Sequence, residues 1–314
     1  MSTEPATPPE EITIPEEWHS LPSDPNYKFP GYCTFKYRGA TMSSTHLQWG
    51  VMQQLEQFRG RSSDIIVASF PKSGTTWLQE IVWRVTHHQS MAGEKGPKTC
   101  LEYRFPLLEM QSQEKLMEMA SWADMTDQRF IKTHLHYHML PESVKTSEAK
   151  VLYVHRDVRD VCVSFYHFSR MINVHKYRGT FADFRDSFMR DALMFCPYRE
   201  HVKGYLEHSD TVLCLTYEQM HQDRGSVVRK VADFLGVSLS DADVDDIVKN
   251  TSFEVMKANP DTNFRQWEDS GMVSGTEEGT FMRKGMVGDW RNYFTEEESE
   301  AFLKWRNEEV ASLE

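Results

Sequence analysis

Three basic residues at or near the ends of predicted strands are the side chains that first indicate chemistry. They are Lys72, Lys132 and Arg156, and the strands are predicted at 65–68, 129–134 and 150–155. In an open parallel sheet, ligands bind in the crevice beyond the carboxyl ends of the strands. Three cations that converge on one crevice repel one another unless an anion lies between them. The placement therefore predicts a binding site for a polyanionic ligand.

The loop at 71–77 reads Pro-Lys-Ser-Gly-Thr-Thr-Trp and lies between the first strand and a predicted helix. Such a turn directs the free N–H groups and the positive end of the helix at one point, which favours an anion. Lys72 adds charge, and Thr75 and Thr76 add hydroxyl donors. Lys72 precedes Gly74, whereas the kinase loop places its lysine after the second glycine. This order favours group transfer from an anionic donor; an ordinary capped helix start is the alternative.

His134 is the candidate general base. An imidazole at the end of the second strand can take a proton from an acceptor hydroxyl near physiological pH. The alternative is a zinc site made of His134, His136 and His138, whose alternate spacing puts them on one face of an extended segment. A neighbouring lysine repels a metal ion, and no matching ligand cluster accompanies the three. His136 and His138 are therefore predicted to be structural.

Two other functional classes are open alternatives. A magnesium-dependent phosphotransferase needs an acidic residue at the end of an apolar strand, and the candidates Asp157 and Glu218 fit the first turns of helices better. An inactive nucleotide-binding or scaffold protein would lack the base or the loop lysine. Both Lys72 and His134 are present. The residues therefore favour an enzyme.

Composition indicates a cytoplasmic globular protein. The chain has 314 residues, 39% of them hydrophobic and 26% charged, with no apolar run as long as a membrane span. The N-terminus lacks the apolar stretch of a signal peptide. A net charge of −12 argues against nucleic acid or an acidic membrane as a partner. The five cysteines lack metal-like spacing and are predicted to be free thiols.

Alternating strands and helices predict an α/β fold, with a central parallel sheet flanked by helices. The fourth strand is expected at 211–216, and the helices at 76–85, from 157 to about 168, and at 181–194, 226–235 and 241–249. We expect an acidic, Pro-rich, loosely ordered tail at 1–30 and one domain at 31–314. The Gly-rich segment 269–288 is predicted to be a lid, and a capping box at Thr295 starts a last helix.

Five motifs in this order resemble the cytosolic sulfotransferases. They are the loop 71–77, Lys132-Thr133-His134, Tyr153-Val154-His155-Arg156 followed by Ser164, Asn250-Thr251-Ser252-Phe253, and the segment 283–290. The resemblance runs from about Tyr32 to the C-terminus. It implies a P-loop-like phosphosulfate-binding loop and a metal-free reaction. The implied donor is phosphoadenosine phosphosulfate (PAPS), the product is adenosine 3′,5′-bisphosphate (PAP), and the acceptor is a phenol, an alcohol or an amine.

The same resemblance assigns roles to individual residues. The 5′-phosphosulfate would be held by Lys72, Ser73, Gly74, Thr75 and Thr76, with Lys72 neutralising charge on the bridging oxygen. The 3′-phosphate would be held by Arg156, Ser164, Arg283, Lys284 and Gly285. The adenine would be surrounded by Trp77, Tyr217, Thr251 and Phe253, although periodicity alone would place Trp77 in the core. His134 would deprotonate the acceptor, with Lys132 assisting at the sulfuryl group.

The chain departs from the family where the acceptor would bind. His136 stands where proline is common, which predicts a more polar mouth. Phenol-preferring members often have two phenylalanines at the positions of Leu107 and Met110. An apolar wall could be formed by Phe35, Tyr103, Phe105, Phe168 and Met171. The expected acceptor is a small, largely apolar phenol, steroid or alcohol, and its identity stays open.

The C-terminal segment also differs. Many family members dimerise through a short segment that corresponds to 291–300 here, and Glu296 replaces its central apolar residue. In a two-fold contact, residues near the axis meet their own copies, so two like charges would be forced together. A monomer or a weak homodimer is therefore predicted.

Overall fold

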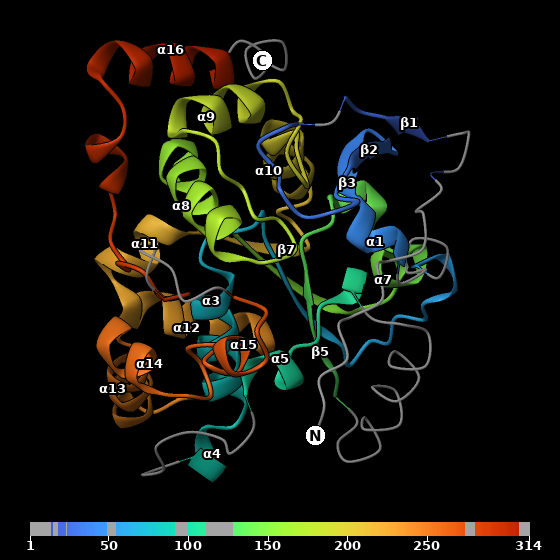
Figure 1. The fold of residues 1–314 in the computed structure, drawn as a ribbon. Helices are drawn as coiled ribbons and strands as arrows, with labels where there is room; N and C mark the ends of the chain where they lie inside the picture. The colour runs from blue at the N-terminus through green and yellow to red at the C-terminus, as the bar shows by residue number, and fades with distance from the viewer. Residues whose placement is uncertain are drawn as a thin grey trace, which may run out of the picture.

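A four-stranded parallel sheet forms the centre of the molecule in a computed structural model of the chain (Figure 1). The structure describes residue 14 and residues 18–22, 24–48, 55–91, 100–110, 128–273 and 280–307. The sheet strands are β4 Ile65–Ala68, β5 Phe130–Thr133, β6 Lys150–His155 and β7 Val212–Thr216. Their order is β5-β4-β6-β7 and all three pairings are parallel. The predicted fold class and all four predicted strands are confirmed.

Each strand sends alternate side chains to opposite faces of the sheet, as the period of two requires. Ile66 and Ala68 belong to one apolar core, and Ile65 and Val67 to the other. The first core is covered by the helices α8 Val158–Met171, α9 Phe181–Met189 and α10 Tyr198–Leu206, and the second by α3 Thr75–Thr86, α12 Arg224–Leu235 and α13 Asp241–Asn250. Because helices cover both faces of the sheet, we expect a ligand-binding site beyond the ends of the strands (Figure 1).

Helix starts follow local capping chemistry. The Asp157 side chain accepts a hydrogen bond from the backbone N–H of Arg159 at the start of α8. The predicted capping box of α16 Glu296–Asn307 is confirmed, because Thr295 N–H donates to Glu298 and Glu298 N–H donates to Thr295 Oγ1. The helix predicted at 181–194 ends earlier, at Met189. Helix α10 was not predicted.

A small antiparallel sheet lies beside the main one and was also not predicted. Its strands are β1 His19–Ser20, β2 Thr34–Tyr37 and β3 Ala40–Ser43. Strand β1 pairs with β2, and the ring of Trp18 stacks on Phe35 at 5.2 Å. His19 and Ser20, which lie within the predicted tail, therefore take part in this sheet. Residues 1–13, 15–17 and 23 of the predicted tail lie outside the described residues.

Short elements complete the described chain. They are α1 Ser44–Gln48, η1 Leu55–Gln57, α4 His88–Met91, α5 Leu101–Arg104, η2 Leu108–Met110, η4 Tyr137–Met139, α7 Glu142–Thr146, α11 Tyr217–Gln222, α14 Phe253–Ala258, α15 Gln266–Asp269 and η5 Asp289–Asn292. All five cysteines are free thiols. Within the described ranges, no helix is both long and apolar enough to cross a membrane.

Candidate active site

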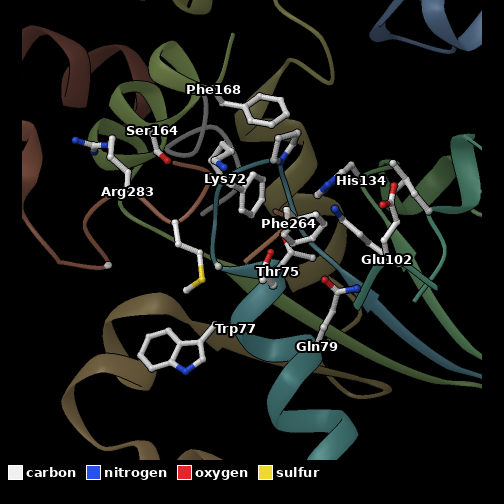
Figure 2. A pocket seen from close by; sticks show the side chains of 18 of the residues that line it. Lys72, Thr75, Trp77, Gln79, Glu102, His134, Ser164, Phe168, Phe264 and Arg283 are labelled. Carbon is white, nitrogen blue, oxygen red and sulfur yellow. The ribbon is translucent and has the colours of Figure 1, made fainter. Parts of the chain in front are cut away.

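A cavity of about 610 Å³ lies beyond the carboxyl ends of β4, β5 and β6. The three cations predicted at or near the strand ends all line it: Lys72, Lys132 and Arg156. Figure 2 shows Lys72 near the middle of the cavity, with Arg283 and Ser164 on one side and His134 and Glu102 on the other. We call the side of Arg283 the donor end and the side of His134 the acceptor end.

The loop between β4 and α3 makes a sharp turn at the floor of the cavity. Gly74 has φ of 108°, and a Cβ added there would come within 2.7 Å of the Tyr217 ring, so both backbone and packing require glycine. Thr75 Oγ1 lies 2.5 Å from Ser69 Oγ, which ties the helix start to the strand end. The first N–H groups of a helix have no partner within the helix, and Thr75 and Thr76 at the start of α3 line the cavity. This local geometry suits an anion.

Ser73 differs from the other loop residues. It is fully buried, and it is absent from the cavity lining, unlike Lys72, Gly74, Thr75 and Thr76. Its Oγ has no hydrogen-bond partner in the part of the chain that the structure describes. The side chain therefore lies behind the loop, where it does not face a ligand.

Lys72 is held in an unusual environment. Its backbone adopts φ of 68°, and its Nζ lies 4.0 Å from the centre of the Phe281 ring and 4.6 Å from that of Phe168. Burial, and after it the charges of nearby cations with Lys132 first, together lower the pKa of Lys72 to about 7. An anion bound here would reverse this effect, because it would favour the charged lysine.

One acidic side chain, Asp289, holds two cations of the donor end. Asp289 accepts hydrogen bonds from Arg283 at 2.7 Å and from Lys284 at 2.6 Å. Burial would raise the pKa of Asp289, but hydrogen bonds from Lys284, Asn292 and Arg283 lower it to about 2. The carboxylate thus stays ionised and holds both cations on the loop that faces Ser164. All five residues predicted to hold the 3′-phosphate line the cavity: Arg156, Ser164, Arg283, Lys284 and Gly285.

Arg156 is fixed between the loop and helix α8. Its guanidinium lies 3.4 Å from Asp160, donates to the carbonyl of Met286 at 2.7 Å and covers the ring of Tyr217. Asp160 in turn accepts the N–H groups of Gly288 and Trp290. The Gly-rich loop is therefore fastened to the start of α8.

The four residues predicted around the adenine come together in space. Trp77 lies edge-on to Tyr217, with ring centres 5.4 Å apart, and its Nε1 donates to the carbonyl of Thr251 at 2.9 Å. A side chain at Gly285 would collide with the ring of Phe253. Trp77 lines the cavity, so tertiary contacts overrule the core position that periodicity predicted.

His134 is positioned by a backbone hydrogen bond. Its Nδ1 lies 2.7 Å from the carbonyl oxygen of Ser69, so Nδ1 carries the proton and Nε2 holds the free lone pair. Burial lowers the pKa of His134 well below its usual value, and Lys132 lowers it further. The imidazole is therefore neutral at physiological pH, as a general base must be before it acts.

Glu109 supports this end of the cavity from behind. Its carboxyl group accepts hydrogen bonds from the backbone N–H of His134 at 2.6 Å and from Thr133 Oγ1 at 2.9 Å. Burial raises the pKa of Glu109 to about 7, against the effect of these bonds. Burial also lowers the pKa of Lys132, and the charge of Glu109 partly offsets this. Glu109 thus holds the backbone of His134 and acts by its charge on Lys132.

Comparison with known proteins identifies the family. The sulfotransferase domain matches residues 62–314. Luciferin sulfotransferase of Photinus pyralis is 37% identical over 281 residues, which cover 82% of this chain and 75% of the relative. Human sulfotransferase 1C2 is 35% identical over 251 residues, which cover 79% and 83%. The chain belongs to the cytosolic sulfotransferase family.

Solved sulfotransferase structures share the fold. Retinol dehydratase, in complex with androsterone and the inactive cofactor PAP, superposes with a TM-score of 0.77 and 25% identity, covering 94% of this chain and 97% of that one. Mouse sulfotransferase SULT7A1, complexed with PAP, superposes with a TM-score of 0.70 and 29% identity, covering 89% and 98%. The central sheet and the loop after β4 are thus those of a sulfotransferase.

The acceptor end of this sulfotransferase differs partly from prediction. Leu107, Met110, Phe105 and Phe168 line the cavity as expected. Three other candidates for the apolar wall, Phe35, Tyr103 and Met171, are not among its lining residues. Phe35 is fully buried in the core beneath the small sheet, Tyr103 is exposed on α5, and Met171 packs against Ile172 and Val273. Aromatic type alone did not separate core from wall.

The prediction of a polar mouth at His136 is wrong. His136 is buried outside the cavity, with its Nε2 2.9 Å from the carbonyl of Phe195. His138 Nε2 lies 2.8 Å from the carbonyl of Arg38. Both rings are therefore used in backbone hydrogen bonds, as predicted for structural side chains. The described residues hold no group of three or more metal-ligating side chains.

Several residues of the site were missed. Glu109, His46, His175 and Phe281 come from segments that carry none of the five motifs. An acidic residue inside the apolar stretch 105–110 was a usable signal for Glu109, because a lone carboxyl group there must be hydrogen-bonded. The others had no local signal, since only the fold brings them to the cavity.

Proposed function

We propose that this sulfotransferase moves the sulfuryl group of PAPS to a hydroxyl or amine of a small, largely apolar acceptor. One observation carries the proposal. A single cavity contains both the anion-favouring loop with Lys72 and a neutral His134 whose Nδ1 is bonded to a carbonyl oxygen. The first can hold an anionic donor, and the second can take a proton from an acceptor.

The residues of the donor end fit a nucleotide with a second phosphate. Arg156 has a buried Nε with no partner in the described chain, although its Nη2 donates to the carbonyl of Met286. Arg283 and Lys284 stand on one loop next to it, and Ser164 adds a hydroxyl. The rings of Trp77 and the other aromatic residues at this end suit a flat base. Retinol dehydratase and mouse SULT7A1 were both solved with PAP, which supports the same donor here.

The proposed chemistry is an in-line displacement. His134 Nε2 takes the proton of the acceptor hydroxyl as its oxygen forms a bond to sulfur. The bond between sulfur and the bridging phosphate oxygen breaks, and the electron pair leaves with PAP. Lys72 neutralises the negative charge that develops on that oxygen, and Lys132 stabilises the sulfuryl oxygens. The balance needs no metal ion and no oxidant.

Relatives support the class of acceptor. Luciferin sulfotransferase and an amine sulfotransferase of Oryctolagus cuniculus, 31% identical, act on a small molecule according to their names. Retinol dehydratase binds androsterone and retinol in its solved complexes. Together with the apolar wall of this cavity, these relatives favour a phenol, a steroid or an alcohol.

Transfer of labelled sulfate from PAPS to phenols, steroids, alcohols and amines tests the proposal. We expect transfer to at least one class, unchanged by a chelator, and a loss of about 10²- to 10³-fold in turnover for Lys72→Met. Arg229→Ala, on an exposed face of α12, is the control and should keep normal turnover. Absence of transfer to every class, with a folded protein that binds PAP, would contradict the assigned reaction.

We further propose a cytoplasmic monomer or weak homodimer. Glu296 is exposed at the start of α16, where an acidic side chain suits the helix and not an apolar contact. Glu298 is already bound to Arg185. Sedimentation at micromolar concentration should therefore give mainly monomer, and Glu296→Val should strengthen association. A tight dimer that Glu296→Val leaves unchanged would mean that another surface is used.

A further inference from the structure

Two buried imidazoles at the acceptor end have no role in the proposed reaction. His46 and His175 both line the cavity, and only 1% and 3% of their surfaces are exposed. Burial lowers the pKa of each to about 4, so both rings are neutral. A neutral imidazole still offers one N–H donor and one acceptor nitrogen. Such groups are costly in an apolar wall unless a polar partner reaches them.

One nitrogen of the His46 ring, Nδ1, is held by Ser43. Its Nδ1 lies 3.1 Å from Ser43 Oγ and 3.2 Å from the carbonyl of the same residue, at the end of β3. Ser43 Oγ is in turn 2.6 Å from the hydroxyl of Thr45, which also lines the cavity. This network occupies Nδ1 and leaves Nε2 as the nitrogen that can bind a ligand.

His175 has an unsatisfied ring nitrogen. Its Nδ1 is buried and has no hydrogen-bond partner among the residues that the structure describes. Its ring is held by aromatic edges, with centre-to-centre distances of 5.3 Å to Tyr32 and 6.0 Å to Phe168. Aromatic contacts hold the ring in place but cannot satisfy the nitrogen. The other ring nitrogen, Nε2, is not among these enclosed atoms, so it is the nitrogen of His175 that can meet a ligand in the cavity.

Both rings lie close to the reacting groups. His46 and His134 pack against the same ring, Phe195, with centres 5.3 and 5.5 Å from it. His46 also lowers the pKa of His134 and of His175, an effect that requires it to lie near both. The pair therefore belongs to the acceptor end, on the side of His134, whereas Arg283 lies on the other side of Lys72 (Figure 2).

We propose that His46 and His175 bind a second hydroxyl group of the acceptor while its first hydroxyl reacts at His134. A hydroxyl both donates and accepts, so it suits either tautomer of a neutral imidazole. Several other side chains of this wall, such as Leu107 and Met110, are apolar, whereas Thr45 and Glu102 add polar atoms. The preferred acceptor is thus a mainly apolar diol. The reaction of the first hydroxyl rests on the proposed function, but binding of the second does not.

Matched phenols provide the probe. The compounds 4-butylphenol and 4-(3-hydroxypropyl)phenol differ only in a terminal methyl or hydroxyl, and 4-hexylphenol and 4-(5-hydroxypentyl)phenol form a longer pair. Calorimetry in the presence of PAP measures the affinity of each compound without turnover. We expect the affinity ratio, hydroxyalkyl over alkyl, to fall about 2- to 12-fold in His46→Leu and in His175→Leu for at least one pair. His19→Leu, an exposed histidine outside the cavity, should leave the ratio unchanged.

Three results would overturn the proposal. The first is an affinity ratio that stays constant in both variants. The second is the failure of all four phenols to bind. In the unmodified protein, a preference for the alkyl compound of about tenfold or more in both pairs would mean that the hydroxyl finds no partner. This last result does not depend on whether a variant folds. If the ratio shifts but no sulfate is transferred to any acceptor, the diol subsite stands and the proposed reaction fails.

Discussion

The donor end and the acceptor end of the cavity satisfy their polar groups in different ways. At the donor end, Arg283 and Lys284 are already paired with Asp289 before a ligand arrives. At the acceptor end, His46 and His175 are neutral, and one nitrogen of His175 has no partner in the described chain. Paired charges fix a geometry for one donor, whereas unpaired neutral groups select an acceptor by the hydrogen bonds that they can offer.

This difference explains how proteins of one fold can bind the same donor and still select different acceptors. The donor end consists of backbone turns, loop cations and a carboxylate that stabilise one another, so a change there affects every reaction. The acceptor end is a wall of separate side chains. Changes there should alter the choice of acceptor and leave donor binding intact.

Removal of His134 should give the largest contrast between the two ends, because it should lower turnover and leave the affinity for PAP almost unchanged. We expect His134→Ala to lower turnover about 10²- to 10⁴-fold, because the proton of the acceptor then has no base. Calorimetric affinity for PAP should stay within about twofold, since no charge-assisted bond of the donor end is lost. His138→Ala, a change at an exposed histidine of the same segment, is the control. Near-normal turnover of His134→Ala with a good acceptor would refute its role as the base.

The 3′-phosphate provides a test of the donor end. PAP and adenosine 5′-phosphate differ only in this group, and each charge-assisted hydrogen bond to it contributes roughly 1.5 to 3 kcal/mol. We expect PAP to bind at least about tenfold more tightly in the unmodified protein. Arg283→Ala should reduce that preference, whereas Arg229→Ala should keep it. If calorimetry gave equal affinities for the two nucleotides, the proposal that the donor end binds the 3′-phosphate would be wrong.

Proton uptake at Lys72 is the smallest expected effect. Its pKa is lowered to about 7, so most of the free protein carries a neutral amine at pH 8. A bound phosphate group favours the charged form and raises this pKa. Binding of PAP at pH 8 should therefore take up as much as one proton, measured by calorimetry in buffers of different ionisation enthalpy. Phosphate groups themselves are fully ionised at this pH.

Lys72→Met is the control for this uptake. The variant should bind PAP with little change in protonation, although Glu109, whose pKa is raised to about 7, remains in place. If the variant takes up the same number of protons, the titrating group is elsewhere. Lys72 would then not be the group that takes up a proton when the nucleotide binds.

Strands and helices of the main sheet were predictable because each has a local signal. Apolar runs such as 65–68 and 150–155 identify buried parallel strands, and Thr295 with Glu298 identifies a helix start. The small sheet had no such signal, since β1 is only two residues long and depends on Trp18 stacking on Phe35. Short strands form because a partner covers them, and the partner is not visible locally.

The sequence alone was enough to predict an anion site after the first strand and His134 as the candidate base. The strand, loop and helix at 65–86 are contiguous, so local backbone rules predict an anion site there, and His134 ends a strand that pairs with β4. Only the tertiary structure decided the acceptor end. His46, His175, Glu109 and Phe281 come from separate segments, and the residue types alone fit a core equally well. Side chains become a wall or a core according to which of their faces the fold leaves uncovered, and that depends on contacts between residues far apart in the chain.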